Sequence, residues 1–543
     1  MVNVLNTLHN YWAEAKKVKS NSRQPNSNLT NSIGFTIVEL LVVVVIIGIL
    51  AAVTIVSYTG IVQKASAAAL KSDIRNAVTT LELDKATTGS YPASEAAANG
   101  GKGLAKSGGT NYQYTVVGND YNLSATSTNA GLTAFHVSST DPGVIADGVW
   151  SGHTAPGGGV VWKQIAVGSS NVCATGTNSL AYCWGANTFG ALGNNSAVDS
   201  MTPVTVSTSG ALNGKTIKSL AGSNYNNCVI ASDDKAYCWG WNSYGAIGNN
   251  STTNALVPTA VDTTGVLSGK TIKSIAVGQY DTCAIASDDK AYCWGMNNAG
   301  QIGNNSTTQS LVPVAVDTTG YLNGKTVKSI GIGEYSACLI ASDNLVYCWG
   351  DNGSGQLGNT NGSQRHSPYP VDTTGVLNGK TAISLSVGAE YACIVASDNN
   401  AYCWGRNDYG TLGNNSNTSS FVPVAVNTAG ALSGKSVLSV YTNQNAYYHT
   451  CAIASDNNAY CWGVNWNGQI GDNTTNTNYA PVAVDRSGVL SSKTIKFISL
   501  GSISTCAVAS DNNAYCWGGN GSGQLGNNST VESHVPVVSA TIP

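Results

Sequence analysis

Short apolar segments separated by polar turns recur seven times between residue 160 and the end of the chain. In one copy, an apolar segment begins at Cys283, a polar turn follows at 287–289, and a second segment ends at Trp294. Two β-favouring segments around a three-residue turn predict an antiparallel hairpin, with Cys283 directly opposite Cys293. The third turn residue then has to be left-handed, a conformation that Asp and Asn tolerate. The copies recur every 55 residues, with one step of 58, and a period of this size predicts a closed or stacked repeat architecture.

The aromatic residues of each hairpin alternate with the second cysteine. Tyr292 and Trp294 flank Cys293, so alternation along a strand places both on the face opposite the cysteine, where Ala284 and Ala286 join them. Seven such Tyr/Trp pairs are predicted to form the packing layer between neighbouring sheets, in preference to a ligand box.

A long apolar segment lies near the amino terminus. Residues 35–56 are apolar except for Glu39, and as a helix they would extend about 33 Å, enough to cross a bilayer. The segment is longer than the core of a cleaved secretory signal, and a basic leader precedes it. The positive-inside rule therefore predicts the leader in the cytoplasm and the rest of the chain outside. A carboxylate such as Glu39 costs about 2.5–3.5 kcal/mol in an apolar span and marks function by default.

A helix and a small sheet are predicted to follow the span. Apolar residues from 61 to about 86 recur mostly at helical spacing, and Gly89 and Pro92 end the pattern. Strands are predicted at 112–117, 121–125 and 132–138. The Pro-Gly-rich segment 154–159 is predicted to be a flexible linker.

All cysteines of the chain belong to the seven hairpins. A disulfide within each hairpin is the favoured interpretation, while metal ligation and reduced structural thiols remain alternatives. Zinc ligands usually lie two to four residues apart and need additional Cys or His. An even cysteine count indicates an oxidising compartment. The predicted pairs are Cys173 with Cys183, Cys228 with Cys238, Cys283 with Cys293, Cys338 with Cys348, Cys393 with Cys403, Cys451 with Cys461, and Cys506 with Cys516.

The repeat resembles that of the regulator of chromosome condensation family. The resemblance rests on three segments. Residues 294–303 contain Trp-Gly, an Asn two residues later and a Gly-Gln-Ile-Gly turn, and residues 354–358 and 522–526 contain the same turn as Gly-Gln-Leu-Gly. It implies a seven-bladed β-propeller over residues 160–543. The family's usual histidine, two residues before the first paired position, is present here only as His449. Propellers of this family serve unrelated tasks, so the resemblance implies a fold and no particular function.

The amino-terminal segment resembles a type IV prepilin processing site. Residues 34–40 read Gly-Phe-Thr-Ile-Val-Glu-Leu. The resemblance implies cleavage after Gly34 by a prepilin peptidase, N-methylation of Phe35, and pairing of Glu39 with the free amine of a neighbouring subunit. Opposite charges desolvated together would offset the burial cost of Glu39. Ile33 and Val56 depart from the family pattern, and a generic signal anchor is the alternative.

Together these patterns predict a multidomain protein. Residues 1–34 are predicted to be a cleaved cytoplasmic leader. Residues 35–152 are predicted to form a type IV pilin-like domain, with a transmembrane α-helix at 35–59 continuing to about 86 and then a small α+β head. A linker at 153–159 precedes an all-β propeller at 160–543, with one intra-hairpin disulfide in each of its seven blades.

Composition restricts the chemistry. Only 10% of residues are charged, and beyond residue 160 there are 16 Lys and Arg against 20 Asp and Glu. This balance argues against a groove for nucleic acid, which needs clustered positive charge. The six His are scattered, and neither a nucleophile–base spacing nor a nucleotide-binding loop is present. We therefore expect no enzymatic activity, cofactor or metal, with calcium at turns such as Asp233-Asp234 as the open alternative.

Comparison of the repeats suggests where a partner binds. An Asn follows each Trp-Gly by two residues, while the positions just before this Asn and two after it vary widely. Equivalent loops of a propeller share a face, and exposed aromatic or Arg side chains there are typical binding anchors. Local packing against the blades is the alternative. The candidate residues are Phe189, Trp241, Tyr244, Met296, Arg406, Tyr409 and Trp466, together with Tyr447 and Tyr448 in the irregular segment 441–450.

The predicted function is that of a type IV pilus minor pilin or tip adhesin whose extracellular propeller binds a surface protein or glycan. The alternative is a pseudopilin-like component of a secretion system whose propeller engages cargo. Expected partners are other pilin subunits, through the amino-terminal helix, and the prepilin peptidase. We expect a single span in the cytoplasmic membrane before assembly, with the propeller outside, and then a place in the cell-surface pilus.

Overall fold

The computed structural model describes residues 68–108, 110–127, 134–139, 141–147, 161–360, 362–444 and 448–539. The chain divides into two compact units, residues 1–156 and 157–543. The predicted membrane span, the processing site at Gly34 and Phe35, Glu39 and the linker lie outside the described residues. Within these residues, none of the helices has both the length and the apolar character needed to cross a membrane.

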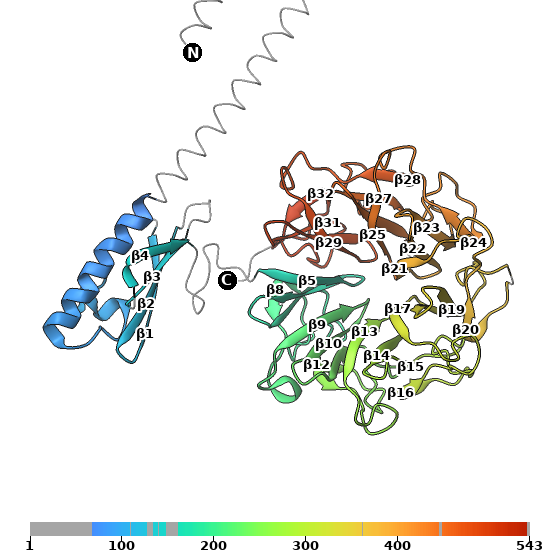
Figure 1. Ribbon diagram of the computed structural model, residues 1–543, viewed down its shortest axis with the longest axis horizontal. Coiled ribbons are helices and arrows are strands. Elements are labelled where there is room, and N and C mark those ends of the chain that lie inside the picture. Colours follow the sequence, from blue (N-terminus) through green and yellow to red (C-terminus); the bar gives the residue numbers. More distant parts are fainter. Residues whose placement is uncertain are drawn as a thin grey trace, which may run out of the picture. The chain divides into compact units, whose positions relative to one another are not determined.

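The first unit is a helix packed on an antiparallel sheet (Figure 1). The helix covers residues 68–88 and buries Leu70, Ile74, Ala77 and Leu81, which recur at helical spacing. These side chains form one core with apolar residues of the sheet. The sheet has the order β1-β2-β3-β4, and two short helical turns precede it. The bounds are η1 Glu95–Ala97, α3 Ala98–Gly101, β1 Thr110–Val117, β2 Asp120–Ser127, β3 Ala134–Ser138 and β4 Asp141–Asp147.

Three strands of this sheet agree with the sequence prediction, and the fourth was not predicted. The β4 strand begins Asp-Pro-Gly, three residue types that are depleted in strands. Because β4 is at the edge of the sheet, a proline is tolerated there.

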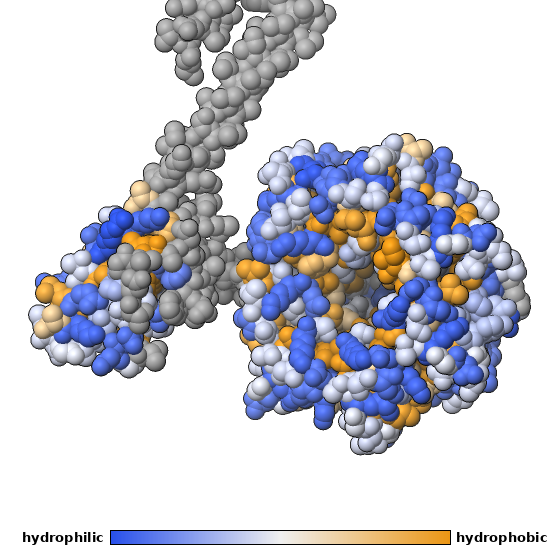
Figure 2. Space-filling model, viewed as in Figure 1, coloured by the Kyte–Doolittle hydropathy of each residue, from blue (hydrophilic) through white to orange (hydrophobic). Residues whose placement is uncertain are grey.

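The second unit is a ring of seven four-stranded antiparallel sheets, which we call blades 1–7 (Figure 1). Each blade uses four consecutive strands, hydrogen-bonded in chain order. The ring is hollowed at its centre, and hydrophobic residues lie around the hollow (Figure 2).

The strands of blades 1–4 have closely similar lengths. Their bounds are β5 Trp162–Val167, β6 Asn171–Gly176, β7 Ala181–Gly185 and β8 Ser200–Thr205 in blade 1; β9 Ile217–Gly222, β10 Asn226–Ala231, β11 Ala236–Gly240 and β12 Ala255–Ala260 in blade 2; β13 Ile272–Val277, β14 Asp281–Ala286, β15 Ala291–Gly295 and β16 Ser310–Ala315 in blade 3; β17 Val327–Ile332, β18 Ser336–Ala341, β19 Val346–Gly350 and β20 Arg365–Pro370 in blade 4.

Blades 5–7 repeat the same lengths. Their bounds are β21 Ala382–Val387, β22 Tyr391–Ala396, β23 Ala401–Gly405 and β24 Ser420–Ala425 in blade 5; β25 Val437–Thr442, β26 His449–Ala454, β27 Ala459–Gly463 and β28 Asn478–Ala483 in blade 6; β29 Ile495–Leu500, β30 Ser504–Ala509, β31 Ala514–Gly518 and β32 Ser533–Val538 in blade 7. A short turn, η2 Gly210–Leu212, lies between blades 1 and 2.

The predicted hairpin is confirmed in all seven blades. Cys283 is the register partner of Cys293, with their Cα atoms 4.0 Å apart, and Asp289 has a φ of 59°. The third turn residue is left-handed in every blade, and all 14 cysteines are paired as predicted. The metal-ligand and free-thiol alternatives for these cysteines are therefore wrong.

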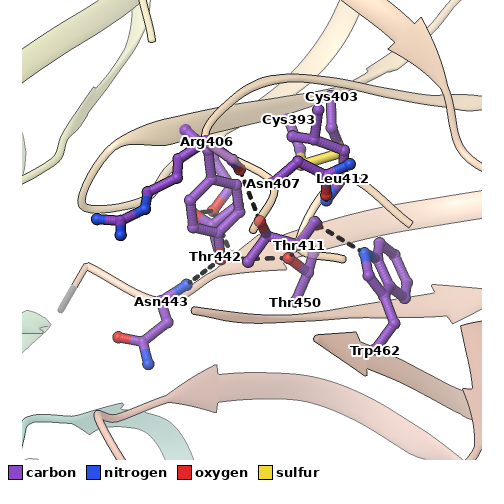
Figure 3. The surroundings of a disulfide bond; sticks show 12 residues. Cys393, Cys403, Arg406, Asn407, Thr411, Leu412, Thr442, Asn443, Thr450 and Trp462 are labelled. Atoms are coloured by element: carbon purple, nitrogen blue, oxygen red, sulfur yellow. Dashed lines mark hydrogen bonds between the residues drawn. A yellow bond between two sulfur atoms is a disulfide. The ribbon is translucent and has the colours of Figure 1, made fainter. Parts of the chain in front are cut away.

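Neighbouring blades pack a disulfide against an aromatic pair, as the alternation predicted. Cys228 and Cys238 of blade 2 share a buried cluster with Tyr292 and Trp294 of blade 3. The indole Nε1 of Trp294 also donates to the carbonyl oxygen of Ala246 in blade 2, at 2.8 Å. Figure 3 shows the same contact between blades 5 and 6, where the carbonyl oxygen of Thr411 accepts from both Trp462 and Thr450. Each blade interface is thus both apolar and hydrogen-bonded.

Candidate partner-binding surface

Two loops of every blade lie at the same end of the ring. Since the four strands alternate in direction, the loop between the first and second strands and the loop between the third and fourth strands leave from one end. The last residue of the short loop accepts a backbone hydrogen bond from the first residue of the long loop. Examples are Tyr225, which accepts from Trp241 at 3.0 Å, and Glu390, which accepts from Arg406 at 2.9 Å.

The Asn that follows holds the long loop in one conformation. In blade 2, Asn242 accepts from the backbone of Ile247 at 2.9 Å and donates to the carbonyl oxygens of Ser251 and Thr253. The Asn at this position is buried in all seven blades. The side chains around it are therefore presented on preorganised loops, a condition that lowers the entropic cost of binding.

Aromatic side chains on these loops form a continuous series across blades 1–4. The ring of Phe189 lies 5.4 Å from that of Tyr225, and Trp241 lies 5.5 Å from Tyr244 and 5.4 Å from Tyr280. Most of these contacts are edge-to-face, the geometry that aromatic quadrupoles favour. The series continues from Tyr280 to Tyr335, with their centroids 6.3 Å apart.

A second aromatic group lies on blades 5 and 6. Tyr409 stacks on Tyr448 at 6.0 Å and meets Trp466 edge-to-face at 5.3 Å. We call both groups together the aromatic arc, which consists of Phe189, Tyr225, Trp241, Tyr244, Tyr280, Tyr335, Tyr409, Tyr448 and Trp466.

Charged side chains adjoin both groups, and Glu334 is hydrogen-bonded to Tyr335 of the first group. Arg406 pairs with Glu390 at 2.9 Å and with Asp408 at 2.8 Å, and its guanidinium donates to the Tyr448 hydroxyl. Burial raises the pKa of Glu334 above its ordinary value, and the neighbouring Glu390 carboxylate raises it further. Burial, assisted by Glu390, also raises the pKa of Tyr448 to about 12. The middle of the arc is thus a partly desolvated acidic region.

The loops of this end carry negative charge. Arg406 is their single cationic residue, and they contain no Lys. Their acidic residues are Asp199, Glu334, Asp351, Glu390, Asp408, Asp472 and Glu532. The surface is therefore unsuited to a polyanion such as nucleic acid.

The structure brings most of the predicted partner-binding residues together. Trp466 and Tyr244 are exposed, at 54% and 37% of their surface. The prediction of exposure is wrong for Met296 and Tyr448, which are both buried. The Arg406 guanidinium covers Tyr448, with its Cζ atom 4.7 Å from the centre of the ring. Met296 is buried because its thioether side chain is apolar. Tyr447 lies outside the described residues.

Sequence comparison missed three members of the arc. Tyr225, Tyr280 and Tyr335 all stand three residues before the first cysteine of their hairpin, a position that is also aromatic at Tyr448. Comparing this position across the repeats would have found them.

The hairpin turns lie at the opposite end of the ring, and their carboxylates form hydrogen bonds and ion pairs with neighbouring side chains. Asp233 accepts from the Tyr237 hydroxyl, and Asp234 pairs with Lys218 at 2.6 Å.

No group of three or more His, Cys, Asp or Glu that could hold a metal ion occurs within the described ranges.

The carboxylate of Asp281, at the start of β14, is buried. Its side chain is fully buried, and neither of its oxygens has a hydrogen-bond partner among the described residues.

Comparisons with known proteins agree with this architecture. The RCC1-like domain matches residues 138–446, and the regulator of chromosome condensation (RCC1) repeat matches residues 495–524 and 511–543. The prokaryotic N-terminal methylation motif matches residues 29–55.

The relatives are diverse. The ultraviolet-B receptor UVR8 of Arabidopsis thaliana is 28% identical over 375 residues, covering 69% of this chain and 80% of that protein. The human E3 ubiquitin-protein ligase HERC2 is 28% identical over 325 residues, covering 59% of this chain but only 6% of HERC2.

Among solved structures, human WBSCR16 superimposes with a TM-score of 0.57 at 17% identity, covering 67% of this chain and 94% of that one. Prp20p of Saccharomyces cerevisiae superimposes with a TM-score of 0.54 at 20% identity, covering 63% and 80%. These similarities establish the fold alone. With its seven repeated blades and the family match over more than half its length, the chain belongs to the RCC1-like domain family and joins this propeller to a prokaryotic N-terminal methylation motif.

Proposed function

We propose that this protein is a minor pilin or pilus-tip adhesin, anchored through its processed amino-terminal helix, whose propeller binds a protein or glycan on another surface through the aromatic arc. The methylation motif supports a membrane-anchored or surface-exported chain. The seven disulfides fit an oxidising location outside the cytoplasm.

The observation that carries the proposal is the aromatic arc. Rigid Tyr and Trp side chains lose little conformational entropy on binding and dominate the energetics of many interfaces. Here they lie on loops already fixed by backbone hydrogen bonds and by a buried Asn in each blade. Relatives of this fold offer a precedent, because yeast RCC1 (Prp20) has been solved with Kap60 bound.

The size of the propeller supports a sparse position. It occupies residues 157–543, more than twice the length of the unit that precedes it. A domain of this size on every subunit would be difficult to accommodate in a close-packed filament, so a tip or occasional position is favoured over a bulk shaft role.

The test compares cells that produce the parent chain with cells that produce the Trp466→Ala variant. Trp466 is exposed, so its truncation leaves no core cavity and should leave secretion and thermal stability unchanged. We expect filaments to form normally while adherence to a target surface falls at least about tenfold, as for the loss of an interface hot spot. Adherence and the location of the protein on filaments are measured together by immunogold microscopy and cell counts.

Tyr479→Ala is the matched control, since Tyr479 is 40% exposed on β28 and is not part of the arc. Equal adherence of the Trp466→Ala variant and the parent would contradict a recognition role for the arc. Normal adherence together with loss of a secreted protein would favour the pseudopilin-like alternative.

A further inference from the structure

One blade boundary departs from the sevenfold repetition outside the aromatic arc. A cavity of about 300 Å³ lies between the link from blade 3 to blade 4 and the outermost strand of blade 4. Its lining includes Tyr321 from the link and Arg365 and Tyr369 from β20. This volume is at the lower end of the range of small-molecule sites.

The other blades have smaller, uncharged residues at all three positions. The residue paired with the strand-ending Gly is Arg365 here, and elsewhere it is Ser200, Ala255, Ser310, Ser420, Asn478 or Ser533. The residue opposite the second cysteine is Tyr369 here, and elsewhere it is Val204, Thr259, Val314, Val424, Val482 or Val537. The link residue is Tyr321 here, and elsewhere it is Ala211, Val266, Val376, Ala431 or Val489.

Six other blades and five other links therefore show that the fold needs none of these three side chains. Asp317, which also lines the cavity, differs in this respect. It accepts from the backbone and the hydroxyl of Thr319, and Asp262 and Asp372 do the same with Thr264 and Thr374. Asp317 is thus part of a repeated turn, while Tyr321, Arg365 and Tyr369 are additions.

The three added side chains contact one another. The rings of Tyr321 and Tyr369 meet edge-to-face at 5.0 Å, and the Arg365 guanidinium lies over the Tyr369 ring at 4.3 Å. Tyr321 is nevertheless 52% exposed, an unusual position for a large aromatic ring. Packing alone does not account for it, because Val or Ala serves at the equivalent place.

The charge of Arg365 is not neutralised by the fold. Its side chain forms no ion pair with any residue of the described ranges, and its buried Nε has no hydrogen-bond partner there. The guanidinium is held against Tyr369, so it meets an incoming anion with little loss of side-chain entropy. A planar guanidinium binds a carboxylate through two parallel hydrogen bonds.

We propose that this cavity, which we call the Arg365 pocket, binds a sugar that carries a carboxylate. The carboxylate accepts from Arg365, and the C–H face of the sugar ring packs on the exposed face of Tyr321, since an aromatic face is electronegative. Ser367 and the second Asp317 oxygen offer hydrogen bonds to sugar hydroxyls. The site is separate from the aromatic arc and does not rest on the adhesion proposal.

The test uses the full chain in a non-ionic detergent without sugar headgroups. The probes are glucuronic acid, galacturonic acid and N-acetylneuraminic acid, with glucose as the neutral comparison. Saturation-transfer NMR reports contact, and calorimetry gives the affinity. For ligands of this size we expect a Kd of about 1 mM or below for at least one acidic probe. Glucose should bind at least about tenfold more weakly, because it lacks the charged hydrogen bonds.

Arg365→Ser and Tyr321→Val return the pocket to residues of the same types that other blades use, so both variants should keep the parent melting temperature. We expect Arg365→Ser to raise the Kd at least about tenfold, and Tyr321→Val to raise it several-fold. Arg365→Lys keeps the positive charge but cannot donate two parallel hydrogen bonds, so this variant should bind the acidic probe more weakly than the parent.

Unchanged affinity of either variant for the acidic probe, equal binding of glucose, or no contact with any acidic probe at 10 mM would overturn the proposal. Trp466→Ala separates this site from the arc, because it should bind the acidic probe like the parent. An adherence defect in Trp466→Ala with intact sugar binding concerns the proposed function alone.

Discussion

The indole Nε1 of Trp184 donates a hydrogen bond to the carbonyl oxygen of Gln524 at 3.0 Å, across 340 residues of sequence. The same bond recurs six times between consecutive blades, for example from Trp349 to Gln301 at 2.8 Å. Blade 7 therefore meets blade 1 through the same contact that joins every other pair of neighbours. The ring closes without a strand shared between its first and last blades.

Replacing Trp184 by Phe should therefore destabilise the ring no more than the same change at an internal interface. We expect Trp184→Phe and Trp349→Phe each to lose about 1–3 kcal/mol, since both leave a buried carbonyl without its donor. Equilibrium denaturation of the two variants gives the comparison. A much larger loss for Trp184→Phe would show that the interface between blades 7 and 1 contributes more to stability than the other interfaces.

Trp241→Ala and Trp294→Ala should separate recognition from packing. Trp294 is fully buried between blades, so its truncation should cost about 3–5 kcal/mol. Trp241 is half-buried and makes edge contacts with Tyr244 and Tyr280, so its truncation should cost about 1–2 kcal/mol while reducing adherence. Thermal melting and adherence are measured on both. Equal destabilisation would mean that Trp241 only packs locally.

Asp281→Asn should stabilise the propeller in a pH-dependent manner. Burial raises the pKa of Asp281 well above its ordinary value. The folded chain then retains a proton that the unfolded chain releases, so the contribution of Asp281 to stability is most favourable below about pH 4 and is lost as the pH rises through the folded-state pKa. Asn occupies the equivalent place at Asn171 and Asn226. We expect a gain of about 1–3 kcal/mol at pH 7 that vanishes below about pH 4.

Denaturation of this variant and the parent across the pH range is the measurement, and parallel stability curves would contradict the assignment. At the opposite end of the ring, burial acts to raise the pKa of Asp343, but hydrogen bonds from the Tyr347 hydroxyl and the Leu345 backbone, together with the ion pair to Lys325, lower it below its ordinary value. Asp343→Asn should therefore lose stability at neutral pH and serves as the control of opposite sign.

Removing one disulfide should weaken the ring without changing the other six. We expect the double change Cys283→Ala with Cys293→Ala to cost about 2–3 kcal/mol, because the unfolded chain loses a short closed loop. Peptide mapping should recover the remaining bridges, each joining cysteines ten residues apart. Bridges between different blades would contradict the independence of the hairpins.

The mature chain is predicted to begin at Phe35 and to carry an N-methyl group. Mass spectrometry of the chain from membranes or filaments tests this, and retention of Met1 would contradict processing. Glu39→Val should leave cleavage intact but prevent incorporation into filaments, because the buried partner of the neighbouring subunit's amine is lost. Normal assembly of that variant would rule out the charge pair.

The sequence predicted the propeller well because each blade encodes its own geometry. Asp289 sets the turn, the turn sets the register of Cys283 with Cys293, and alternation then places Trp294 between blades. None of these inferences needs a contact between distant segments.

Features that depend on distant segments were not predictable in this way. Tyr280 joins the aromatic arc because two loops of different blades meet, and the Arg365 pocket needs Tyr321 from a link 44 residues earlier. Burial of Met296 and Tyr448 has the same origin, since exposure depends on what folds over a side chain. The strand β4 was not predicted because it contains Pro142 and Gly143, residue types that are rare in strands.

The spacing of the cysteines has a consequence for export. The first cysteine of each blade to enter an oxidising compartment meets its correct partner ten residues later, before any cysteine of the next blade arrives. A propeller that crosses a membrane in amino-to-carboxyl order can thus be oxidised one hairpin at a time, and the correct partner is always the nearest cysteine along the chain. Maturation of this propeller should accordingly depend on an oxidant and be insensitive to the loss of a disulfide isomerase.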